Sequence, residues 1–409
     1  MNSTARTRVL ILGGGFAGLA CAQALPADRY AVTLIDRNGC FEFLPNIHEL
    51  ISAVTTPELL RLPLAPAMQR ACHDFLRQTV VAIDPAARSV RTSRRRTVAY
   101  DFLVVALGGV DASHGVSGVA EHAFPFKSVD QCARIGKRLE RLASRRKPGN
   151  VVIVGGGLEG VEALGEVLRR YRDSALQVTL IEARAHLLPG APAALDTYLR
   201  RLCKRHGVKV RTRSPVQRVE AGSVILRNKA VLPSDLTIWT GGPAPPPLLA
   251  ESGLAPAKAW APVNEYLQIA DHPEIYTAGD AAELPVPVAK QAYHALDMGE
   301  HVARNIQRTG AGRKPIRFRP SDKPMLVSFG DLDCFLIAGK LVVAGAPLSA
   351  GKEAVFEAVM AQLDRRALPM RALHALQRGD RAARELLWPK LSSWKALRRQ
   401  SQVRVLSAF

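Results

Sequence analysis

Short runs of apolar residues, each followed by a cluster of glycines, recur along the chain. The first run, Val9 to Leu12, leads directly into the glycine-rich segment 13–18 and then into a helix-like apolar stretch at 19–25. A second apolar run at 31–35 ends in Asp36. Uninterrupted apolar runs are typical of parallel strands that are buried on both faces. The pattern therefore predicts a strand, a glycine turn, a helix and a second strand that ends in an acid.

The same order of elements returns in the second quarter of the chain. An apolar run at 151–154 precedes a glycine-rich segment at 155–160 and a helix-like stretch at 161–171. A further apolar run at 178–181 ends in Glu182. This repeat predicts an α/β fold with two Rossmann-like dinucleotide-binding units.

The three spaced glycines of each turn have different tasks. The first permits the tight turn, the second lets the backbone approach a pyrophosphate, and the third lets the helix pack on its strand. The helix N-terminus attracts phosphate, and the acid after the second strand receives the hydroxyl groups of the adenosine ribose. Candidate cofactor-binding residues are Gly13, Gly15, Phe16, Ala17, Gly18, Asp36 and Arg37 in the first unit, and Gly155, Gly157, Gly160 and Glu182 in the second.

Three more apolar runs end in glycine. The runs at 100–109 and 236–243 both close in a glycine pair, which is typical of hinges where the chain leaves one domain and re-enters it. The third run, at 275–280, ends in Gly-Asp and is followed by a predicted helix from about 288 to 308. Further candidate cofactor contacts at these strand ends are Ala106, Gly108, Gly241, Gly279 and Asp280.

Charge and cysteine content narrow the function classes. The 56 Lys and Arg against 36 Asp and Glu give a net charge of +20, which attracts an anionic lipid surface or nucleic acid. No apolar stretch reaches the roughly 18–20 residues of a membrane-spanning helix, and the short polar start favours a cytoplasmic location. The six cysteines form no CxxC pair, so we expect reduced thiols and no metal site, with Cys132 and Cys334 as a less favoured redox pair.

The C-terminal part divides into two regions with different residue patterns. Apolar runs at 325–329 and 341–344 predict a small sheet, and 353–363 predicts an amphipathic helix. The last 45 residues, 365–409, carry 11 Lys and Arg against two acids, or +9. Apolar side chains recur there at helical spacing among the cations, at Leu387, Leu391, Trp394 and Leu397. This pattern indicates a helix on an anionic membrane surface, with a solvated basic helix or a partner-docking tail as alternatives.

This arrangement of motifs, over about residues 8–345, resembles the two-domain flavoproteins of the pyridine nucleotide-disulfide oxidoreductase superfamily. The resemblance implies an NAD(P)H-binding domain that is inserted into an FAD-binding domain. It assigns FAD to Gly13, Gly15, Gly18, Asp36 and Asp280, and the nicotinamide cofactor to the second unit. The implied domains are 1–115 with 244–320 for FAD, 116–243 for NAD(P)H, 321–363 for the C-terminal sheet and helix, and 364–409 for a basic amphipathic tail.

Within that superfamily, several segments resemble the type II NADH dehydrogenases and the related ferroptosis-suppressor quinone reductases. These segments are 41–50, the Gly-Val-Glu at 160–162 and Trp239 with its following glycines. Lys290-Gln291-Ala292-Tyr293 resembles the Lys-x-Ala-Tyr of the ferroptosis-suppressor group. The disulfide-reducing branch is disfavoured because Cys40 has no partner in a CxxxxC pair.

The resemblance implies roles for three side chains. Glu162 would lie at the interface of the cofactors and handle protons, Lys290 would donate a hydrogen bond to the flavin or quinone, and Tyr293 would donate a proton. The residues themselves leave simpler interpretations open: an exposed helix glutamate, a solvated lysine and a packing aromatic side chain.

The implied function is the transfer of a hydride from NADH to FAD and of two electrons to a quinone, at the inner face of the cytoplasmic membrane. NADPH is an alternative because Arg184 and His186 follow Glu182. A soluble reductase with a protein or sulfide-type acceptor, and a redox-regulated flavoprotein that binds nucleic acid, are the other hypotheses. Nucleic acid is the less favoured partner, and a homodimer is left open.

Overall fold

The computed structural model describes residues 6–365 and 403–408. Its first sheet has six strands in the order β21-β22-β9-β1-β2-β5. All neighbours are parallel except β21 and β22. The strands are β1 (Thr7–Leu12), β2 (Tyr30–Asp36), β5 (Asp74–Arg77), β9 (Phe102–Val105), β21 (Gln268–Ile269) and β22 (His272–Thr277). The predicted strands at 9–12 and 31–35 are thus confirmed, and β1 lies in the middle of the sheet, buried on both faces.

Two helices from distant parts of the chain pack together beside this sheet. The helix α1 (Phe16–Ala24) connects β1 with β2, and α9 (Ala292–Gly310) lies against it. At their crossing, a Cβ atom on Gly299 would lie 2.1 Å from the carbonyl oxygen of Ala17. Only glycine allows this approach of the two backbones.

The sequence predicted that this helix begins at about residue 288. In the structure it begins at Ala292, because residues 284–291 form a loop that contains two prolines.

The second sheet has five parallel strands in the order β11-β18-β12-β13-β14. Its strands are β11 (Ala123–Pro125), β12 (Asn150–Val154), β13 (Gln177–Ile181), β14 (Lys209–Arg211) and β18 (Leu236–Trp239), and its helices are α5 (Val129–Ala143), α6 (Leu158–Tyr171) and α7 (Ala193–Arg205). The chain passes into this unit through β10 (Val110–Asp111) and returns through β19 (Pro243–Ala244), and these two strands pair with each other. The two parallel sheets confirm the predicted α/β class.

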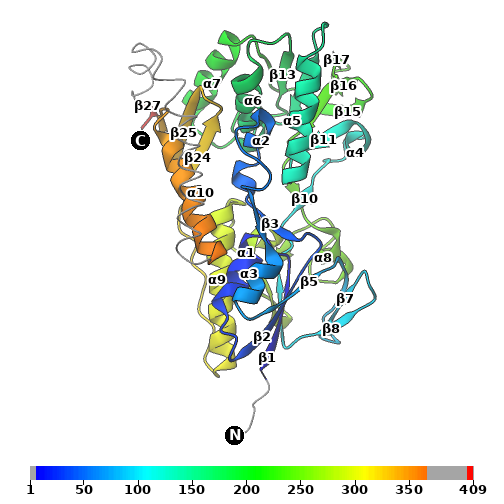
Figure 1. Ribbon diagram of the computed structural model, residues 1–409, viewed down its shortest axis with the longest axis vertical. Helices are drawn as coiled ribbons and strands as arrows, with labels where there is room; N and C mark the ends of the chain where they lie inside the picture. Colours follow the sequence, from blue (N-terminus) through cyan, green and yellow to red (C-terminus); the bar gives the residue numbers. More distant parts are fainter. Residues whose placement is uncertain (1–5, 366–402, 409) are drawn as a thin grey trace.

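A third, antiparallel sheet and one helix follow. The sheet consists of β24 (Met325–Phe329), β25 (Asp333–Ala338), β26 (Leu341–Ala344) and β27 (Arg404–Ser407), and the helix is α10 (Leu348–Asp364). The strand β24 packs on α6, while α10 lies along α1, where Gln23 donates a hydrogen bond to the carbonyl of Leu363. Figure 1 shows α10 along one side of the molecule, reaching from the second unit to the first. The C-terminal region therefore contacts both units.

The strand β27 corrects the prediction of a helical tail over 364–409. Val405 pairs with Val343 of β26, and the Arg404 guanidinium bonds the buried carboxylate of Asp333. A strand of four residues is too short to stand out in a basic segment, and its partner strand lies about 60 positions earlier. Residues 366–402, including the predicted apolar stripe with Trp394, lie outside the described residues.

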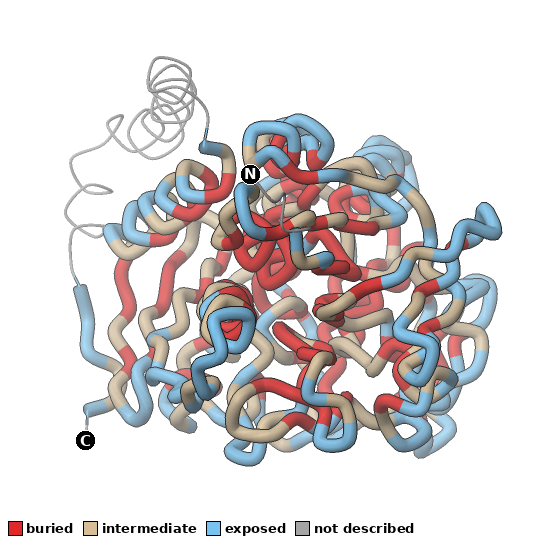
Figure 2. The backbone as a smooth tube through the Cα atoms, turned by 90° about the horizontal axis from the view of Figure 1, so that it is seen from below, coloured by how far each residue is buried: buried red, intermediate tan, exposed pale blue. Residues whose placement is uncertain are grey.

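The core runs through both parallel sheets into the C-terminal helix. Figure 2 shows the buried segments gathered in the interior and the exposed ones around it. A series of edge-to-face aromatic contacts links Phe41, Phe16, Phe43 and Phe356, with ring centroids 4.8 to 5.5 Å apart. These side chains come from β3 (Cys40–Glu42), α1, the turn that follows β3, and α10. Such pairs add about 0.5–1.5 kcal/mol each beyond the burial of their area, so they help to fix α10 against the first unit.

The remaining elements are short. They are β3 (Cys40–Glu42), β4 (Arg61–Pro63), β6 (Val80–Asp84), β7 (Ser89–Thr92), β8 (Thr97–Ala99), β15 (Val216–Glu220), β16 (Ser223–Leu226), β17 (Val231–Pro233), β20 (Ala261–Pro262), β23 (Ala282–Glu283), α2 (Glu49–Ser52), α3 (Leu64–Arg70), α4 (Val119–His122), α8 (Pro247–Glu251), and the 3-10 turns η1 (Leu44–Asn46) and η2 (Gly279–Ala281). Within the described part of the chain, no helix is both long and apolar enough to cross a membrane.

Candidate functional site

The first glycine turn has the geometry that a bound dinucleotide needs. Gly13 has a φ of 101°, and a Cβ atom there would lie 2.3 Å from the carbonyl oxygen of Ala106. A Cβ atom on Gly18 would lie 1.9 Å from the carbonyl oxygen of Gly13, so the third glycine is required for the helix to approach the strand. By contrast, nothing lies within 4 Å of a Cβ atom at Gly15, where the backbone is open to a ligand.

The second turn repeats this geometry in detail. Gly155 has a φ of 110° and its Cβ atom would lie 2.5 Å from the carbonyl oxygen of Thr240. The Cβ atom of Gly160 would lie 1.8 Å from the carbonyl oxygen of Gly155, whereas Gly157 again faces open space. The local sequence therefore folds into the same open cradle twice.

Each cradle is closed by the acid that the spacing predicted. The Asp36 carboxylate accepts hydrogen bonds from the backbone N–H of Gly14, at 2.7 Å, and of Asn38, at 2.6 Å. The Glu182 carboxylate accepts them from Gly156, at 2.6 Å, and from Arg184, at 2.7 Å. Both carboxylates are thus oriented before a ligand arrives.

These features fit a dinucleotide in each unit. Gly15 and Gly157 are the residues that precede α1 and α6, and neither has a side chain that could occupy the helix N-terminus. The N–H groups of the first helical turn therefore face the space above the glycine, where a pyrophosphate would be bound. The oriented acid stands where the ribose hydroxyl groups would be.

The other predicted cofactor residues take different places around the cradles. Phe16 and Ala17 are buried in the first turn of α1, and Arg37 is exposed directly after Asp36. Ala106 and Gly108 follow β9, and Gly241 follows β18, where Trp239 donates its Nε1–H to the carbonyl of Ala112 at 2.7 Å. These residues therefore line the two links between the units.

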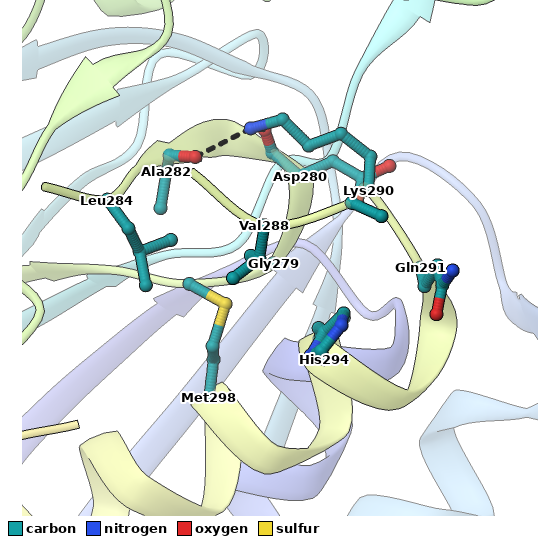
Figure 3. Close-up of a pocket in the computed structure, with 11 residues that line it drawn as sticks. Gly279, Asp280, Ala282, Leu284, Val288, Lys290, Gln291, His294 and Met298 are labelled. Carbon is teal, nitrogen blue, oxygen red and sulfur yellow. Dashed lines mark hydrogen bonds between the residues drawn. The ribbon is translucent and has the colours of Figure 1, made fainter. Parts of the chain in front are cut away.

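Gly279 and Asp280 lie beside a small pocket at the start of α9 (Figure 3). Lys290 Nζ donates hydrogen bonds to the carbonyl oxygens of Asp280, at 2.8 Å, and Ala282, at 2.6 Å. It also lies 4.3 Å from the centroid of the Trp260 ring. The Lys290 side chain is thus partly buried, with 26% of it exposed, and the residue lies two positions before α9. It ties the loop before α9 to the Gly-Asp turn, and burial lowers its pKa.

Tyr293 was predicted as a proton donor near this loop. In the structure it packs against the core in the first turn of α9, and burial raises its pKa. The neighbouring His294 lines the pocket instead, and its buried Nδ1 has no hydrogen-bond partner in the described part of the chain. Burial lowers the pKa of His294, which favours the neutral imidazole.

Glu162 belongs to a buried cluster of titratable groups, and the interpretation as an exposed helix glutamate was wrong. Its side chain is 7% exposed. Oε1 accepts hydrogen bonds from Lys352 Nζ, at 2.5 Å, and from the backbone N–H of Ser328, at 3.1 Å. Oε2 lies 3.6 Å from His48 Nδ1, and His48 Nε2 lies 3.2 Å from Lys352 Nζ. We call Glu162, Lys352 and His48 the buried triad.

The three members come from all three parts of the fold. Glu162 lies one turn inside α6, Lys352 lies in α10, and His48 precedes α2. Burial raises the pKa of Glu162 and lowers that of His48 well below its ordinary value, since Lys352 adds a positive charge beside it. His48 is therefore neutral, and its Nε2 accepts from the Lys352 ammonium while Nδ1–H faces Glu162.

Lys352 and His48 were missed in the sequence. Lys352 occupies the buried face of α10 together with Phe356, Val359 and Leu363. A lysine at helical spacing with apolar residues is the signal that could have found it, because such a cation must have a partner. His48 gives no comparable signal, since it lies in an irregular segment between polar and apolar residues.

The six cysteines all lie in the described part of the chain and all are free. Cys132 and Cys334 are buried, and burial raises the pKa of both thiols, that of Cys334 to about 11. Such thiols are poor nucleophiles. Among the described residues there is also no cluster of three His, Cys, Asp or Glu side chains that could hold a metal ion.

A comparison with protein families identifies residues 7–299 as matching the pyridine nucleotide-disulphide oxidoreductase model. The chain belongs to this family. The family match spans both glycine turns, the links between the units and the first half of α9, so it covers the predicted FAD- and nicotinamide-binding parts.

Relatives and solved structures agree with this assignment. The type II NADH:quinone oxidoreductase of Staphylococcus epidermidis is 28% identical over 382 residues, covering 86% of this chain and 93% of the relative. The structure of NDH2 from Plasmodium falciparum with NADH superposes with a TM-score of 0.79 at 18% identity, covering 88% and 96% of the two chains. The sulfide:quinone oxidoreductase of Aquifex aeolicus gives 0.77 at 22% identity, covering 88% and 91%. At these identities the solved structures establish the shared fold.

Proposed function

We propose that this protein is an FAD-dependent NADH:quinone oxidoreductase. The observation that carries the proposal is the presence, in one fold, of the buried triad and of two glycine cradles that are each closed by their own acid. A two-dinucleotide enzyme needs both cradles, and reduction of a quinone to a quinol needs protons as well as electrons. The names of the relatives that match over most of their length, type II NADH:quinone oxidoreductases, support the same activity.

In this proposal the first cradle holds FAD and the second holds NADH. Asp36 receives the ribose hydroxyls of FAD, Asp280 lies at its ribityl chain, and Glu182 receives the ribose hydroxyls of NADH. When bound, the two cofactors supply hydride transfer from nicotinamide to flavin and the onward transfer of two electrons. Burial raises the pKa of Asp280, and Lys290 beside it acts in the opposite direction. Lys290 is thus a positioning residue, which keeps the Gly-Asp turn in place.

The buried triad then handles protons at stated atoms. Lys352 Nζ holds Glu162 Oε1, while His48 Nδ1–H faces Glu162 Oε2. Burial raises the pKa of Glu162, and the Lys352 ammonium acts in the opposite direction, so the two influences together set how tightly this carboxyl group holds a proton. The triad is therefore a proton store for the acceptor side of the reaction. Tyr293 remains a proposed proton donor.

The acceptor site is proposed to work at the inner face of the cytoplasmic membrane. Quinones with long isoprenoid chains dissolve in lipid, so the enzyme must reach the bilayer surface. The net charge of +20, with +9 in residues 365–409, supports attraction to anionic lipid. A sulfide-type acceptor is disfavoured because Cys132 and Cys334 are buried thiols.

Steady-state NADH oxidation with a panel of quinones tests the proposal. The purified protein should be yellow, bleach when NADH is added, and recover its colour with a quinone. Gly15→Trp, which fills the open cradle, should abolish FAD binding, whereas Gly312→Trp in an exposed turn should not. A folded protein that binds no FAD, or a flavin that NADH reduces and no quinone reoxidises, would overturn the proposed function.

Single Cys132→Ser and Cys334→Ser substitutions give a check on the acceptor. Both thiols are buried with raised pKa values, so NADH:quinone turnover should stay within about twofold of wild type, since a conservative polar replacement leaves the packing nearly unchanged. The measurement is the rate of flavin reoxidation by quinone. Loss of this step in either variant, with reduction by NADH preserved, would favour a sulfide-type acceptor.

A further inference from the structure

Two short stretches of helix face each other beside the buried triad. His48 and Ser52 lie four residues apart at the two ends of α2, and Glu162 and Glu166 lie four residues apart on α6. His48 faces Glu162, and Ser52 Oγ donates a hydrogen bond to Glu166 Oε2. Residues four apart on a helix have Cβ atoms about 5–6 Å apart. The two carboxyl groups therefore make successive contacts between α2 and α6, Glu162 with His48 and Glu166 with Ser52. The two helices pack against each other, as Figure 1 shows.

Glu166 is as buried as a core leucine, with a residue exposure of 1%. Among the described residues, Arg169 Nη1 lies 3.5 Å from Oε1 and 3.4 Å from Oε2 of Glu166, and both contacts are long. A strongly paired carboxylate would have shorter, aligned hydrogen bonds. The contacts with Arg169 therefore do not hold Glu166 in its ionised form.

Ser52 lets the site accept both protonation states. Its hydroxyl lies within hydrogen-bond distance of Glu166 Oε2 and, at 3.2 Å, of the Glu49 carbonyl oxygen. When Glu166 is a carboxylate, the hydroxyl donates to it. When Glu166 is an acid, it donates to Ser52 Oγ, and the hydroxyl hydrogen turns to the Glu49 carbonyl. Neither state leaves a buried donor without an acceptor.

The charged groups around Glu166 come from three helices. Glu49 of α2 raises the pKa of Glu166, whereas Arg169 of α6 and Lys352 of α10 lower it. Burial is the largest influence, and the pKa of Glu166 is raised to about 7. Glu49 and Lys352 act in the same directions on Glu162, so the two carboxyl groups share one electrostatic environment.

The side chains next to Glu166 reach solvent, although the Glu162 side chain is 7% exposed and Glu166 itself is 1% exposed. The Arg169 side chain beside it is 22% exposed, and Arg170, which donates to the carbonyl of Ser52, is 34% exposed. Around Glu162, the side chains of His48 and Lys352 are only 2% and 9% exposed. Arg169 and Arg170 therefore mark a solvent edge beside Glu166.

We propose that Glu166 is a relay residue that passes protons from solvent to Glu162. The inference rests on the proposed function, in which NADH brings two electrons and one proton while quinol formation takes two electrons and two protons. The second proton comes from solvent. The O–H bond of protonated Glu166 breaks as one forms on the Glu162 carboxylate, directly or through an intervening water, and Glu166 then regains a proton at the edge marked by Arg169.

The test is the isosteric change Glu166→Gln, which keeps a hydrogen-bond acceptor for Ser52 and removes the titration. Stopped-flow absorbance separates the reduction of flavin by NADH from its reoxidation by a water-soluble quinone. Reduction should stay within about twofold of wild type, while reoxidation should slow by about tenfold or more at and below pH 7, where wild-type Glu166 holds a proton, because a positioned proton donor contributes at least that much. Imidazole buffer should restore part of the lost rate by supplying protons.

A second readout does not depend on turnover. Infrared difference spectra of the flavin-loaded enzyme between pH 6 and pH 8 should show the carbonyl band of a protonated carboxylic acid in wild type, and the band should be missing in Glu166→Gln. The control Glu140→Gln changes an exposed glutamate of α5 that pairs with Arg170, and it should leave both readouts unchanged. If Glu166→Gln cannot be loaded with FAD, Ser52→Ala takes its place and should slow reoxidation without slowing reduction.

The outcomes separate the two proposals. A wild-type enzyme whose flavin NADH reduces and no quinone reoxidises contradicts the proposed function. A wild-type enzyme that does reduce quinone, together with a Glu166→Gln variant that has the same rate and pH profile, overturns the relay alone. A loss of rate that imidazole does not restore, with the infrared band unchanged, assigns Glu166 a structural role and overturns the relay too.

Discussion

Carboxylates occur in this molecule in two settings, and the setting decides what each can do. Asp36 and Glu182 are oriented by backbone N–H groups at the open edge of a glycine cradle. Glu162 and Glu166 are buried among side chains that balance or exchange a proton. We expect the first setting to bind hydroxyl groups and the second to hold protons, so that one residue type would serve recognition in one place and acid–base chemistry in another.

We expect Glu182 to decide the preference between NADH and NADPH. Its oriented carboxylate would accept ribose hydroxyls and repel a 2′-phosphate, so kcat/KM should be higher for NADH than for NADPH. The sequence suggested that His186 could bind the 2′-phosphate of NADPH. In the structure its Nδ1 lies 3.2 Å from the carboxylate of Asp196, so this histidine is less available for that contact. Glu182→Ala should narrow the preference by about tenfold, the scale of one lost charged hydrogen bond.

The matched control for this prediction is Glu220→Ala, which removes an exposed carboxylate of β15. It should leave the ratio of kcat/KM values for the two cofactors unchanged. A wild-type enzyme that prefers NADPH contradicts the assignment of Glu182, as does an unchanged ratio in Glu182→Ala.

The stability of the fold should depend on pH through Glu166. Its pKa is raised to about 7 in the native state, above the ordinary value of 4.5, so the native state binds the proton more tightly than the unfolded chain. The stability that this gives is fully present below about pH 4.5 and is lost as the pH rises through 7. Glu166→Gln should therefore be as stable as wild type at pH 5 and more stable at pH 8, by up to about 3 kcal/mol.

Thermal unfolding midpoints of the flavin-loaded enzyme at the two pH values measure this effect. Glu140→Gln is again the control, because the carboxylate it removes is exposed on α5. Equal shifts of the Glu166→Gln midpoint at pH 5 and pH 8 would show that the change acts through packing and would contradict the titration.

Among the elements, the helix α6 contributes to three different parts of the structure. Its first turn faces the second cradle, its next turn carries Glu162 and Glu166, and Gly165 lies on the face that meets the C-terminal sheet. A Cβ atom on Gly165 would lie 2.4 Å from the backbone nitrogen of Gly330. The C-terminal sheet, and with it the helix that carries Lys352, is thus placed by a backbone contact on the helix that also faces the NADH-binding cradle.

Gly165→Ala should push that sheet away from α6. The added methyl group meets backbone, which cannot turn aside, so we expect a destabilisation of about 1–3 kcal/mol, the usual cost of overpacking. Reoxidation of the flavin by quinone should slow more than its reduction by NADH, because Lys352 moves with the sheet. Unfolding midpoints and stopped-flow absorbance measure the two effects.

Gly351→Ala provides the matched control within α10. The nearest heavy atom to its added Cβ would be Leu326 Cδ1 at 4.0 Å, so the methyl group has room. Alanine is a better helix former than glycine by about 1 kcal/mol, and this variant should be at least as stable as wild type. Equal behaviour of the two alanine variants would show that the α6–β24 contact does not position the sheet.

The sequence predicted those parts of the molecule that depend on neighbours along the chain. A glycine turn, its helix and its acid lie within about 30 residues, and their spacing follows from the geometry of one βαβ unit. The buried triad depends on contacts between residues far apart: His48 and Lys352 are separated by 304 positions, and Glu162 and Lys352 by 190. No local pattern encodes such a meeting. The strand β27 was missed for the same reason, since its pairing partner lies in β26.

At the scale of the whole molecule, the C-terminal region holds the two dinucleotide units together on the side of the buried triad. It contacts α1 through α10 and α6 through β24, and it returns to the sheet at β27, where Arg404 bonds Asp333. The basic segment 366–402 is therefore connected at both of its ends to the part of the fold that supplies Lys352.

We expect this segment to bind anionic membranes. Each cation near such a surface contributes about 1 kcal/mol, and the attraction fades within a Debye length of about 10 Å at 0.1 M salt. Deleting the whole C-terminus would also remove β27, so the change to test is the joint replacement of Lys395, Arg398 and Arg399 by glutamate. The variant should lose salt-sensitive pelleting with anionic vesicles and should keep its turnover with a water-soluble short-chain quinone.

The matched control replaces Arg94, Arg95 and Arg96 by glutamate, which changes the net charge equally at an exposed hairpin tip between β7 and β8. If binding depended on net charge alone, both triple variants would lose it equally, and the assignment to the C-terminal segment would be wrong. Duplex DNA at the same ionic strength provides the second comparison. Because an apolar stripe with Trp394 gains free energy only in lipid or a protein groove, the wild type should bind vesicles more tightly than DNA, and the opposite order would favour a nucleic-acid partner.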